Sequence, residues 1–287
     1  MQDRVSPIVP IVTDFTMSRL RNVPRSAWLG HGPFALWLVE AMRPNRIVEL
    51  GTHTGFSFFC FCQAMRDLGL AGTVHAIDTW EGDKHAGFYD TAIFASVEAV
   101  VQEQFDGLGH LHRTTFDAAR DAFPDGSVDI LHIDGLHTFD AVKHDFDKWR
   151  SSLTNPGVVL FHDTQVRRDD FGVHRLWAQL TTSYPSFEFL HSNGLGVLGI
   201  GDGFPEALQQ LFNLGAQPDK AASVRRQFEL MGREAEFKIE AEIAQSLTGR
   251  VGHIEAALEG MQLSRSWKVT APLRKCDMLW RRVSGRS

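Results

Sequence analysis

The sequence predicts an α/β fold: a seven-stranded sheet, mostly parallel with an antiparallel last strand, followed by a C-terminal helical extension. Between residues 46 and 203, short apolar runs that suit strands alternate with segments that suit helices, and this alternation is typical of a parallel sheet. Beyond about residue 204 the strand patterns stop. We therefore expect an N-terminal helical cap at 1–45, a sheet domain at 46–203, and a helical, coiled-coil-like tail at 204–287.

The composition is that of a globular protein without a basic field. The 287 residues carry a net charge of −6 with a pI near 6.1, which argues against nucleic acid as a partner. The cysteines Cys60, Cys62 and Cys276 form no disulfide framework. The N-terminus has no signal-peptide pattern, and no apolar run approaches the roughly 18 residues of a membrane span, so we expect a soluble, cytoplasmic protein.

The segment before the first strand reads as a helix. Ser26–Met42 has an amphipathic pattern, and Pro44 ends it before the strand begins. We expect this helix to pack against the sheet edge or to cover a crevice, and we expect its His31 to be structural.

The first strand, Ile47–Leu50, leads into a glycine turn and a helix over 56–68. Gly51 and Gly55 follow Glu49; glycine lets backbone approach a ligand, and the helix N-terminus offers unpaired N–H groups. Strand, tight glycine turn and helix are typical of the start of a nucleotide-binding crevice. The spacing is GxxxG, not the GxGxxG of dinucleotide-binding proteins, so a nucleotide-like ligand and a turn that binds nothing both stay open.

The second and third strands also end in polar groups. Thr73–Asp78 ends in a carboxylate, which suits a ribose because both of its hydroxyls can donate to one carboxylate. The loop at 79–90 is polar and aromatic, and it either covers a ligand or packs as a surface loop. Leu111–Thr115 is the third strand, and Phe116 follows it.

The fourth and fifth strands bring carboxylates and histidines to the same edge. Val128–Asp134 is followed by His137, and Val158–Phe161 is followed by His162 and Asp163. Ligands bind at the carboxyl ends of the strands in an open α/β sheet, so we expect these groups to share one crevice. The remaining expected elements are helices at 91–106, 138–153 and 172–183, a turn at 155–157, and an antiparallel hairpin at 187–191 and 196–200.

Two features mark the tail. Within Ala221–Met261 apolar residues recur at spacings of four, four, three, four and three, which is close to a heptad seam. That helix either packs on a partner, such as a second copy, or covers its own domain. Ser264–Ser287 is basic with interleaved tryptophans, and it lies on an anionic membrane, docks on an acidic partner or is disordered. The seam residues are Ile243, Leu247, Val251, Ile254, Leu258 and Met261.

The crevice chemistry suggests a metal and a base. The oxygens of Asp134 and Asp163 suit Mg²⁺, whereas an imidazole from His162 would favour Mn²⁺ or Fe²⁺. A divalent ion there would lower the pKa of a substrate hydroxyl, and His137 has the unperturbed pKa of a base that could take its proton.

Four motifs carry a family resemblance: VELGTHTGFS, AIDTWEGD, LHIDGLHTFDAV…DFDKW and GVVLFHD. Together they resemble the class I S-adenosylmethionine-dependent methyltransferases over about residues 26–201. Within these, they are similar to the branch that includes the macrocin and mycinamicin sugar O-methyltransferases and the cephalosporin-hydroxylase-like proteins. The resemblance implies a Rossmann-like methyltransferase sheet that binds S-adenosylmethionine at 46–203.

The resemblance also implies roles for particular residues. In the metal-dependent sugar enzymes an aspartate ends strand four, a histidine three residues later is the base, and an acidic pair ends strand five. Asp134, His137 and Asp163 fit that pattern, whereas His162 departs from it by removing one negative charge from the metal site. The cofactor-binding positions are matched by Glu49, Gly51 and Gly55 around the methionine, Asp78 at the ribose, and Thr115 and Phe116 beside the adenine.

From this resemblance we expect an S-adenosylmethionine-dependent O-methyltransferase that uses Mg²⁺ or Mn²⁺ and methylates a sugar hydroxyl of a bacterial surface glycan or glycoside. The tail motif SRSWKVTAPLR resembles segments of bacterial polysaccharide-assembly proteins, often joined to glycosyltransferases, which points to a glycan substrate. We expect the basic tail to make peripheral contact with the inner face of the membrane or with glycosyltransferases. Two alternatives stay open: a metal-dependent oxygenase on the same fold, and a cofactor-binding scaffold without catalysis.

Overall fold

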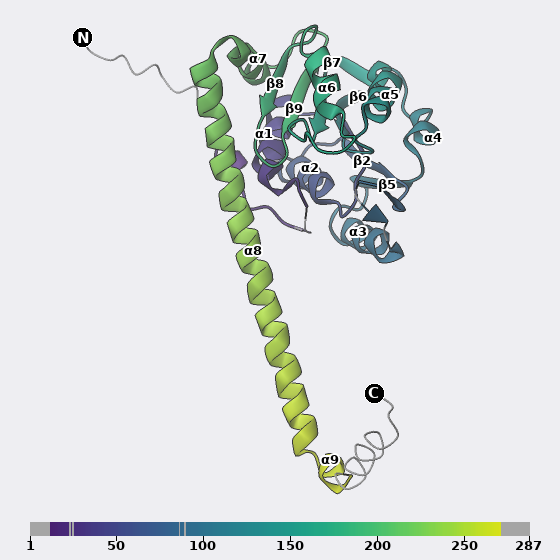
Figure 1. Ribbon diagram of the computed structural model, residues 1–287, viewed down its shortest axis with the longest axis vertical. Helices are drawn as coiled ribbons and strands as arrows, with labels where there is room; N and C mark the ends of the chain where they lie inside the picture. Colours follow the sequence, from purple (N-terminus) through teal and green to yellow (C-terminus); the bar gives the residue numbers. More distant parts are fainter. Residues whose placement is uncertain (1–11, 23, 25, 86, 89, 271–287) are drawn as a thin grey trace, which may run out of the picture. The chain divides into compact units, whose positions relative to one another are not determined.

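The computed structural model describes residues 12–22, 24, 26–85, 87–88 and 90–270 (Figure 1). By its internal contacts the chain divides into two compact units, Met1–Glu236 and Phe237–Ser287. The first unit contains the whole sheet and runs past residue 203, because the helix Glu206–Asn213 (α7) adds Leu208 and Leu211 to the same core.

One seven-stranded sheet organises the first unit. Its strand order is β5-β2-β1-β6-β7-β9-β8; β9 runs antiparallel to both of its neighbours, and the other pairs are parallel. This confirms the predicted fold class, a Rossmann-like α/β sheet with a helical extension. The strands are β1 (Arg46–Leu50), β2 (Thr73–Asp78), β5 (Gly109–Arg113), β6 (Val128–Ile133), β7 (Leu153–His162), β8 (Ser186–Phe189) and β9 (Leu195–Ile200).

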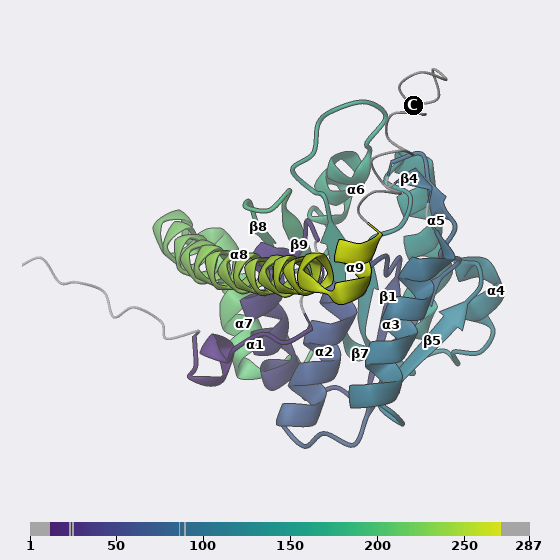
Figure 2. The same ribbon diagram turned by 90° about the horizontal axis from the view of Figure 1, so that it is seen from below.

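Helices cover both faces of the sheet (Figure 2). Successive residues of a strand point to opposite faces, so β1 gives Ile47 to one core and Val48 to the other. On the first face pack α1 (Gly32–Met42), α2 (Phe56–Asp67) and α3 (Thr91–Gln104), and on the second α4 (Phe116–Arg120), α5 (Phe139–Trp149) and α6 (Val173–Leu180).

The N-terminal helix is more buried than its sequence predicts. The pattern of Ser26–Met42 indicated an amphipathic helix, but α1 starts only at Gly32, after a short 3₁₀ turn at Leu29–His31, and is buried from Gly32 to Val39. The prediction of amphipathy is wrong because α1 is covered from several sides: it contacts α2 and α7, and its Phe34 ring packs on Phe189 and Phe228. It is a core helix.

Three further elements differ from the sequence prediction. The expected turn at 155–157 lies inside β7, which begins at Leu153 and contains a cis Asn155–Pro156 bond. The helix α4, which directly follows Thr115, was not predicted because it is only five residues long. The loop at 79–90 contains a small hairpin of β3 (Gly82–Asp83) and β4 (Gly87–Phe88).

The tail is helical where it is described. One helix, α8, runs over Pro218–Leu263, and α9 covers Arg265–Val269. Among the described residues no helix is both long and apolar enough to cross a membrane. The predicted basic segment falls mostly on residues 271–287, outside the described part of the chain, as does Cys276; within the predicted seam, the side chain of Ile243 is also outside it.

A buried carboxyl group on α5 gives a test of the packing. Burial raises the pKa of Asp145 to about 7, with His144 opposing the rise and Asp117 adding to it. The folded chain therefore holds this proton more tightly than the unfolded chain, whose aspartates titrate near pH 4. Stability is lost as the pH rises from about 4 to 7.

We predict that Asp145→Asn raises the free energy of unfolding by about 1–3 kcal/mol at pH 8 and changes it little at pH 4. Urea unfolding at the two pH values measures this. Asp147→Asn is the matched control, because its exposed ion pair with Lys143 contributes little. Equal effects of Asp145→Asn at both pH values would contradict the assignment.

Candidate functional site

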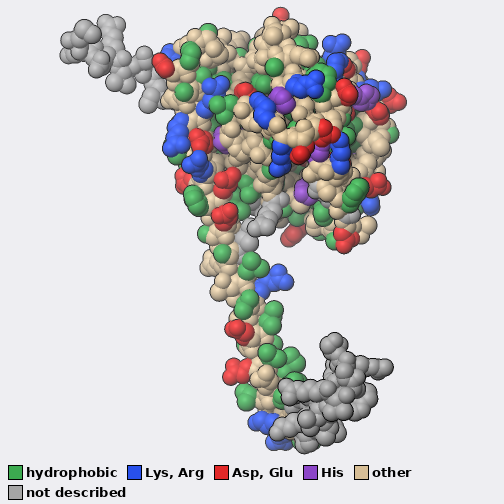
Figure 3. Space-filling view, viewed as in Figure 1, with side chains coloured by type: hydrophobic (Ala, Val, Ile, Leu, Met, Phe, Trp, Pro, Cys, Tyr) green, Lys and Arg blue, Asp and Glu red, His purple; other side chains and the backbone are tan. Residues whose placement is uncertain are grey.

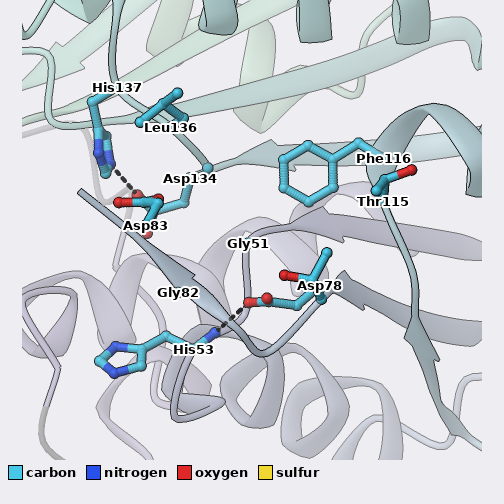
Figure 4. Close-up of a pocket in the computed structure, with 12 residues that line it drawn as sticks. Gly51, His53, Asp78, Gly82, Asp83, Thr115, Phe116, Asp134, Leu136 and His137 are labelled. Atoms are coloured by element: carbon cyan, nitrogen blue, oxygen red, sulfur yellow. Dashed lines mark hydrogen bonds and ion pairs between the residues drawn. The ribbon is translucent and has the colours of Figure 1, made fainter. Parts of the chain in front are cut away.

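A pocket of about 230 Å³ lies at the carboxyl ends of β1, β2 and β6 (Figure 4). Six of the ten predicted site residues line it: Gly51, Asp78, Thr115, Phe116, Asp134 and His137. Sequence reasoning did not select the other six lining residues, which come from the turn after β1, the loop after β2 and the end of β6: His53, Thr79, Gly82, Asp83, Gly135 and Leu136.

Gly51 makes the floor of this pocket possible. Its φ of +90° lies in the left-handed region, and a Cβ atom there would meet the carbonyl oxygen of Asp134 at 2.3 Å. The amide of Asp134 donates to the carbonyl of Leu50 at 2.9 Å. The close approach of these two strand ends therefore requires a residue without a side chain.

Asp78 holds the glycine turn in place. Its Oδ2 accepts hydrogen bonds from the amides of Thr52 at 2.8 Å and His53 at 3.0 Å, and its Oδ1 accepts one from the amide of Trp80 at 2.7 Å. Each carboxylate oxygen can accept more than one bond, so Asp78 retains capacity for a ligand hydroxyl. The carboxylate both shapes the pocket and faces it.

The end of the pocket that lies away from His137 is formed by Thr115 and the ring of Phe116 (Figure 4). Thr115 caps α4, its side chain accepting from the amide of Ala118 at 3.2 Å, and this fixes the position of Phe116. Gly135 leaves room for that ring, since a Cβ there would meet it at 2.5 Å. In Figure 4 His137 and Asp83 lie toward one end of the pocket, and Thr115 and Phe116 toward the other.

Glu49 has a different environment from the other predicted cofactor residues. It is fully buried beneath the sheet edge, and its Oε2 lies 2.8 Å from Nδ1 of His132, which is equally buried. Neither residue lines the pocket, and neither does Gly55, the left-handed residue that begins α2. Glu49 thus contacts β6 through His132 and does not face the pocket.

Four ionisable groups converge beside the pocket. Nε2 of His137 lies 3.2 Å from Oδ1 of Asp134 and 3.0 Å from Oδ2 of Asp163. Nδ1 of His162 lies 3.2 Å from the same Asp134 oxygen and 3.4 Å from Oδ1 of Asp163. Asp163 has a φ of +62°, a conformation that is rare outside glycine and that strains the backbone directly after β7.

The charges of this cluster stabilise one another. Burial opposes the charged form of His162, but the charge of Asp134 outweighs it and raises the pKa of His162 to about 9. For His137, burial again lowers the pKa, but the hydrogen bond to Asp134 and the charges of Asp134 and Asp163 together outweigh burial, so the pKa of His137 is raised. Burial works against the charged form of Asp134 too, yet His162 lowers the pKa of that carboxyl below its usual range. The carboxylate of Asp134 and the protonated forms of the two imidazoles therefore stabilise one another.

A backbone carbonyl on the side away from the carboxylates fixes the orientation of the His162 ring. Its Nε2 donates to the carbonyl of Ser192 at 3.1 Å, and Nε2 of His31 lies 3.1 Å from the same oxygen. The ring of His191 in turn lies 3.2 Å, at Nε2, from the carbonyl of Gly30. Sequence reasoning missed Ser192, because a backbone acceptor leaves no signal in a side-chain pattern.

These residues fit a divalent cation. One ligand atom from each of Asp134, His162 and Asp163 lies within 4.8 Å of the others. With Nε2 of His162 bound to a carbonyl, Nδ1 is the nitrogen that faces the carboxylates, and a tautomer fixed in this way is typical of metal-ligating histidines. A cation at these oxygens would displace the imidazole protons.

Two loops meet over the base candidate. The ring of Phe171 stacks on that of His137, with centroids 4.9 Å apart and planes 9° apart, and also on His85 of the loop after β2. Asp170 pairs with Lys84 and His85. The loop at 79–90 therefore forms part of the pocket wall through Gly82 and Asp83.

Comparison with known proteins finds a family model that matches part of this chain. The family model described as a methyltransferase domain matches residues 48–164. This match supports a class I methyltransferase domain. It covers the glycine turn, Asp78, the pocket wall and the whole acid–histidine cluster.

The individual relatives either match only part of their own length or share little sequence identity with this chain. An uncharacterized protein, y4gI, of Sinorhizobium fredii is 52% identical over 188 residues, which cover 66% of this chain and 21% of that protein, so the chain spans about a fifth of its relative. Two solved structures are the O-methyltransferase TomG of Streptomyces achromogenes in complex with S-adenosylmethionine (15% identity, 62% and 82% of the chains, TM-score 0.45) and an O-methyltransferase of Bacillus cereus in complex with S-adenosylhomocysteine (14%, 63% and 84%, 0.45).

We predict that Gly51→Ala lowers the free energy of unfolding by about 1–3 kcal/mol more than Gly87→Ala does. Both glycines have a φ near +90°, but a Cβ at Gly87 meets nothing within 4 Å, so the difference isolates the contact with Asp134. Urea unfolding of the two variants measures it. Equal losses would mean that the ends of β1 and β6 separate without cost.

Proposed function

We propose that this protein is an S-adenosylmethionine-dependent O-methyltransferase that methylates a sugar hydroxyl with the assistance of a divalent metal. The observation that carries the proposal is that Asp134 and His137 line the same pocket as Gly51, Asp78 and Phe116. A cofactor-binding wall and a proton acceptor thus share one cavity, which a transfer reaction needs and a binding scaffold does not.

The pocket suits the cofactor in shape and in charge. Asp78 would accept the ribose hydroxyls, Phe116 and Thr115 would bound the adenine, and the Gly51 turn would admit the methionine portion. When bound, S-adenosylmethionine supplies an electrophilic methyl group on a positively charged sulfur. The carboxylates of Asp78, Asp83 and Asp134 give this wall the opposite charge.

His137 is the proposed general base. Stacking on Phe171 fixes the plane of its ring, and the carboxylates of Asp134 and Asp163 stabilise the imidazolium that forms once it has taken a proton. A divalent ion held by Asp134, His162 and Asp163 would lower the pKa of the acceptor hydroxyl and release Nε2 of His137 from the carboxylates.

The acceptor is proposed from the sequence motifs. The IDGLH and FHD combination is similar to that of sugar O-methyltransferases, and the SRSWKVTAPLR motif resembles segments of polysaccharide-assembly proteins. We therefore propose a bacterial surface glycan or glycoside as the substrate class. The protein would work in the cytoplasm, with its basic C-terminal segment at the inner face of the membrane or on a glycosyltransferase.

We predict that His137→Ala slows methyl transfer by about two to four orders of magnitude and leaves the Kd for S-adenosylhomocysteine within about threefold. Release of S-adenosylhomocysteine measures the rate, and calorimetry measures the affinity. His144→Ala, an exposed histidine paired with Asp117 on the second face of the sheet, is the matched control. Unchanged turnover in His137→Ala would exclude this residue as the base.

We predict that a chelator abolishes transfer and that Mg²⁺ or Mn²⁺ restores it. Calorimetric titration with Mn²⁺ should give a Kd at least tenfold weaker for Asp163→Asn than for the unchanged chain. Asp117→Asn is the matched control, because it removes an exposed carboxylate on α4, and it should leave the Kd unchanged. Full activity in chelator would make the three residues a structural cluster.

One observation favours a second candidate, the metal-dependent oxygenase. Both His137 and His162 place a ring nitrogen 3.2 Å from the same oxygen of Asp134, and two histidines with one carboxylate are typical ligands of non-haem iron. That enzyme would consume oxygen with Fe²⁺ and form no S-adenosylhomocysteine. Measuring both products on one glycan acceptor separates the two functions.

A further inference from the structure

The second unit carries an apolar stripe without a covering layer in the described chain. Hydrophobic side chains, green in Figure 3, recur along α8 beyond Phe237. Single exposed apolar residues are ordinary, but a contiguous row of them marks an interaction surface. The exposed fractions are 53% for Leu247, 53% for Val251, 65% for Ile254, 47% for Leu258 and 56% for Met261.

These residues share one helix face with a seven-residue repeat. Val251 and Leu258 occupy position a of a heptad, and Leu247, Ile254 and Met261 occupy position d. Ala244 fills the preceding a position, so the seam from 244 to 261 contains no charged residue and is about 27 Å long. This is the pattern of a coiled-coil strand.

The opposite face indicates that the helix needs a partner. Gly249, Gly252 and Gly260 fall at positions f, b and c, outside the seam, and a Cβ at any of them would meet nothing within 4 Å. Each glycine costs about 1 kcal/mol of helix stability relative to alanine. A helix with three such residues gains its stability from packing, and the seam is the face that can pack.

Charge selects the partner. From 237 to 263 the chain has two basic residues, Lys238 and Arg250, against four acidic ones, Glu240, Glu242, Glu255 and Glu259. That excess of negative charge argues against an anionic membrane as the occupant of the seam. A seam with a seven-residue repeat packs instead on another helix, so the occupant is a protein helix.

The flanking positions fit a second copy of this chain in parallel orientation. Arg250 lies at g and Glu255 at e of the next heptad, and in a parallel coiled coil these two positions face each other across the seam. Two such opposite-charge pairs form in a symmetric dimer. An antiparallel arrangement that buries the same seam would bring g against g, so Arg250 would lie opposite Ala257 and lose this pairing.

We propose that residues 244–261 of α8 form a parallel two-stranded coiled coil with a second copy of the chain. This pairing is independent of the methyltransferase proposal, because it uses none of the pocket residues.

Sedimentation velocity of the full chain over about 1–100 μM tests the proposal. We expect a monomer–dimer equilibrium whose Kd rises at least 100-fold in Ile254→Asp, because that change buries a charge in the seam. His253→Asp, at an outer position of the same turn, should leave the Kd within about threefold. A monomer at every concentration would overturn the proposal. The seam would then be covered by this chain's own basic segment or by another protein.

A charge exchange tests the orientation without altering the seam. Arg250→Glu or Glu255→Arg alone should raise the Kd about tenfold, because each replaces two attractive pairs by two repulsive ones. The double variant R250E/E255R should restore the original Kd. A double variant that dimerises no better than the single variants would overturn the parallel pairing.

Discussion

Two histidines converge on a single carboxylate oxygen, that of Asp134, and the rest of the site depends on this contact. Asp134 directly follows β6, next to the turn after β1, and together with His137 it belongs to both the pocket wall and the acid–histidine cluster. It stays charged because His162 and His137 supply compensating positive charge inside a buried site. An unpaired carboxylate there would have its pKa raised by burial, and the cluster would lose its negative character.

The fold supports this contact from both sides of the sheet edge. On one side the absence of a side chain at Gly51 lets the β1 turn lie against the Asp134 carbonyl, and Asp78 fixes that turn through two of its amides. On the other side the Ser192 carbonyl, held between two histidines, fixes the ring of His162. A site of this kind is preorganised, because its polar groups are oriented by backbone and by neighbouring side chains before a ligand arrives.

Sequence patterns predicted the features that depend on local chemistry. An apolar run that ends in a carboxylate placed β2 at its observed bounds, and the rule that ligands bind at strand carboxyl ends brought Asp78, Asp134 and His137 to one edge. Features that depend on tertiary contacts were not predictable in this way. The burial of α1 and the pairing of Glu49 with His132 depend on distant elements, and neither changes the periodicity of its own segment.

We propose that one pocket holds S-adenosylmethionine against an acid–histidine cluster that binds a divalent metal. A crystal structure of the chain grown with S-adenosylhomocysteine and Mn²⁺, with anomalous data for manganese, tests both halves at once. We expect the nucleoside between Asp78 and Phe116 and an anomalous peak shared by Asp134, His162 and Asp163. S-adenosylhomocysteine bound elsewhere, or a pocket filled as predicted with no manganese at the three residues, would contradict it.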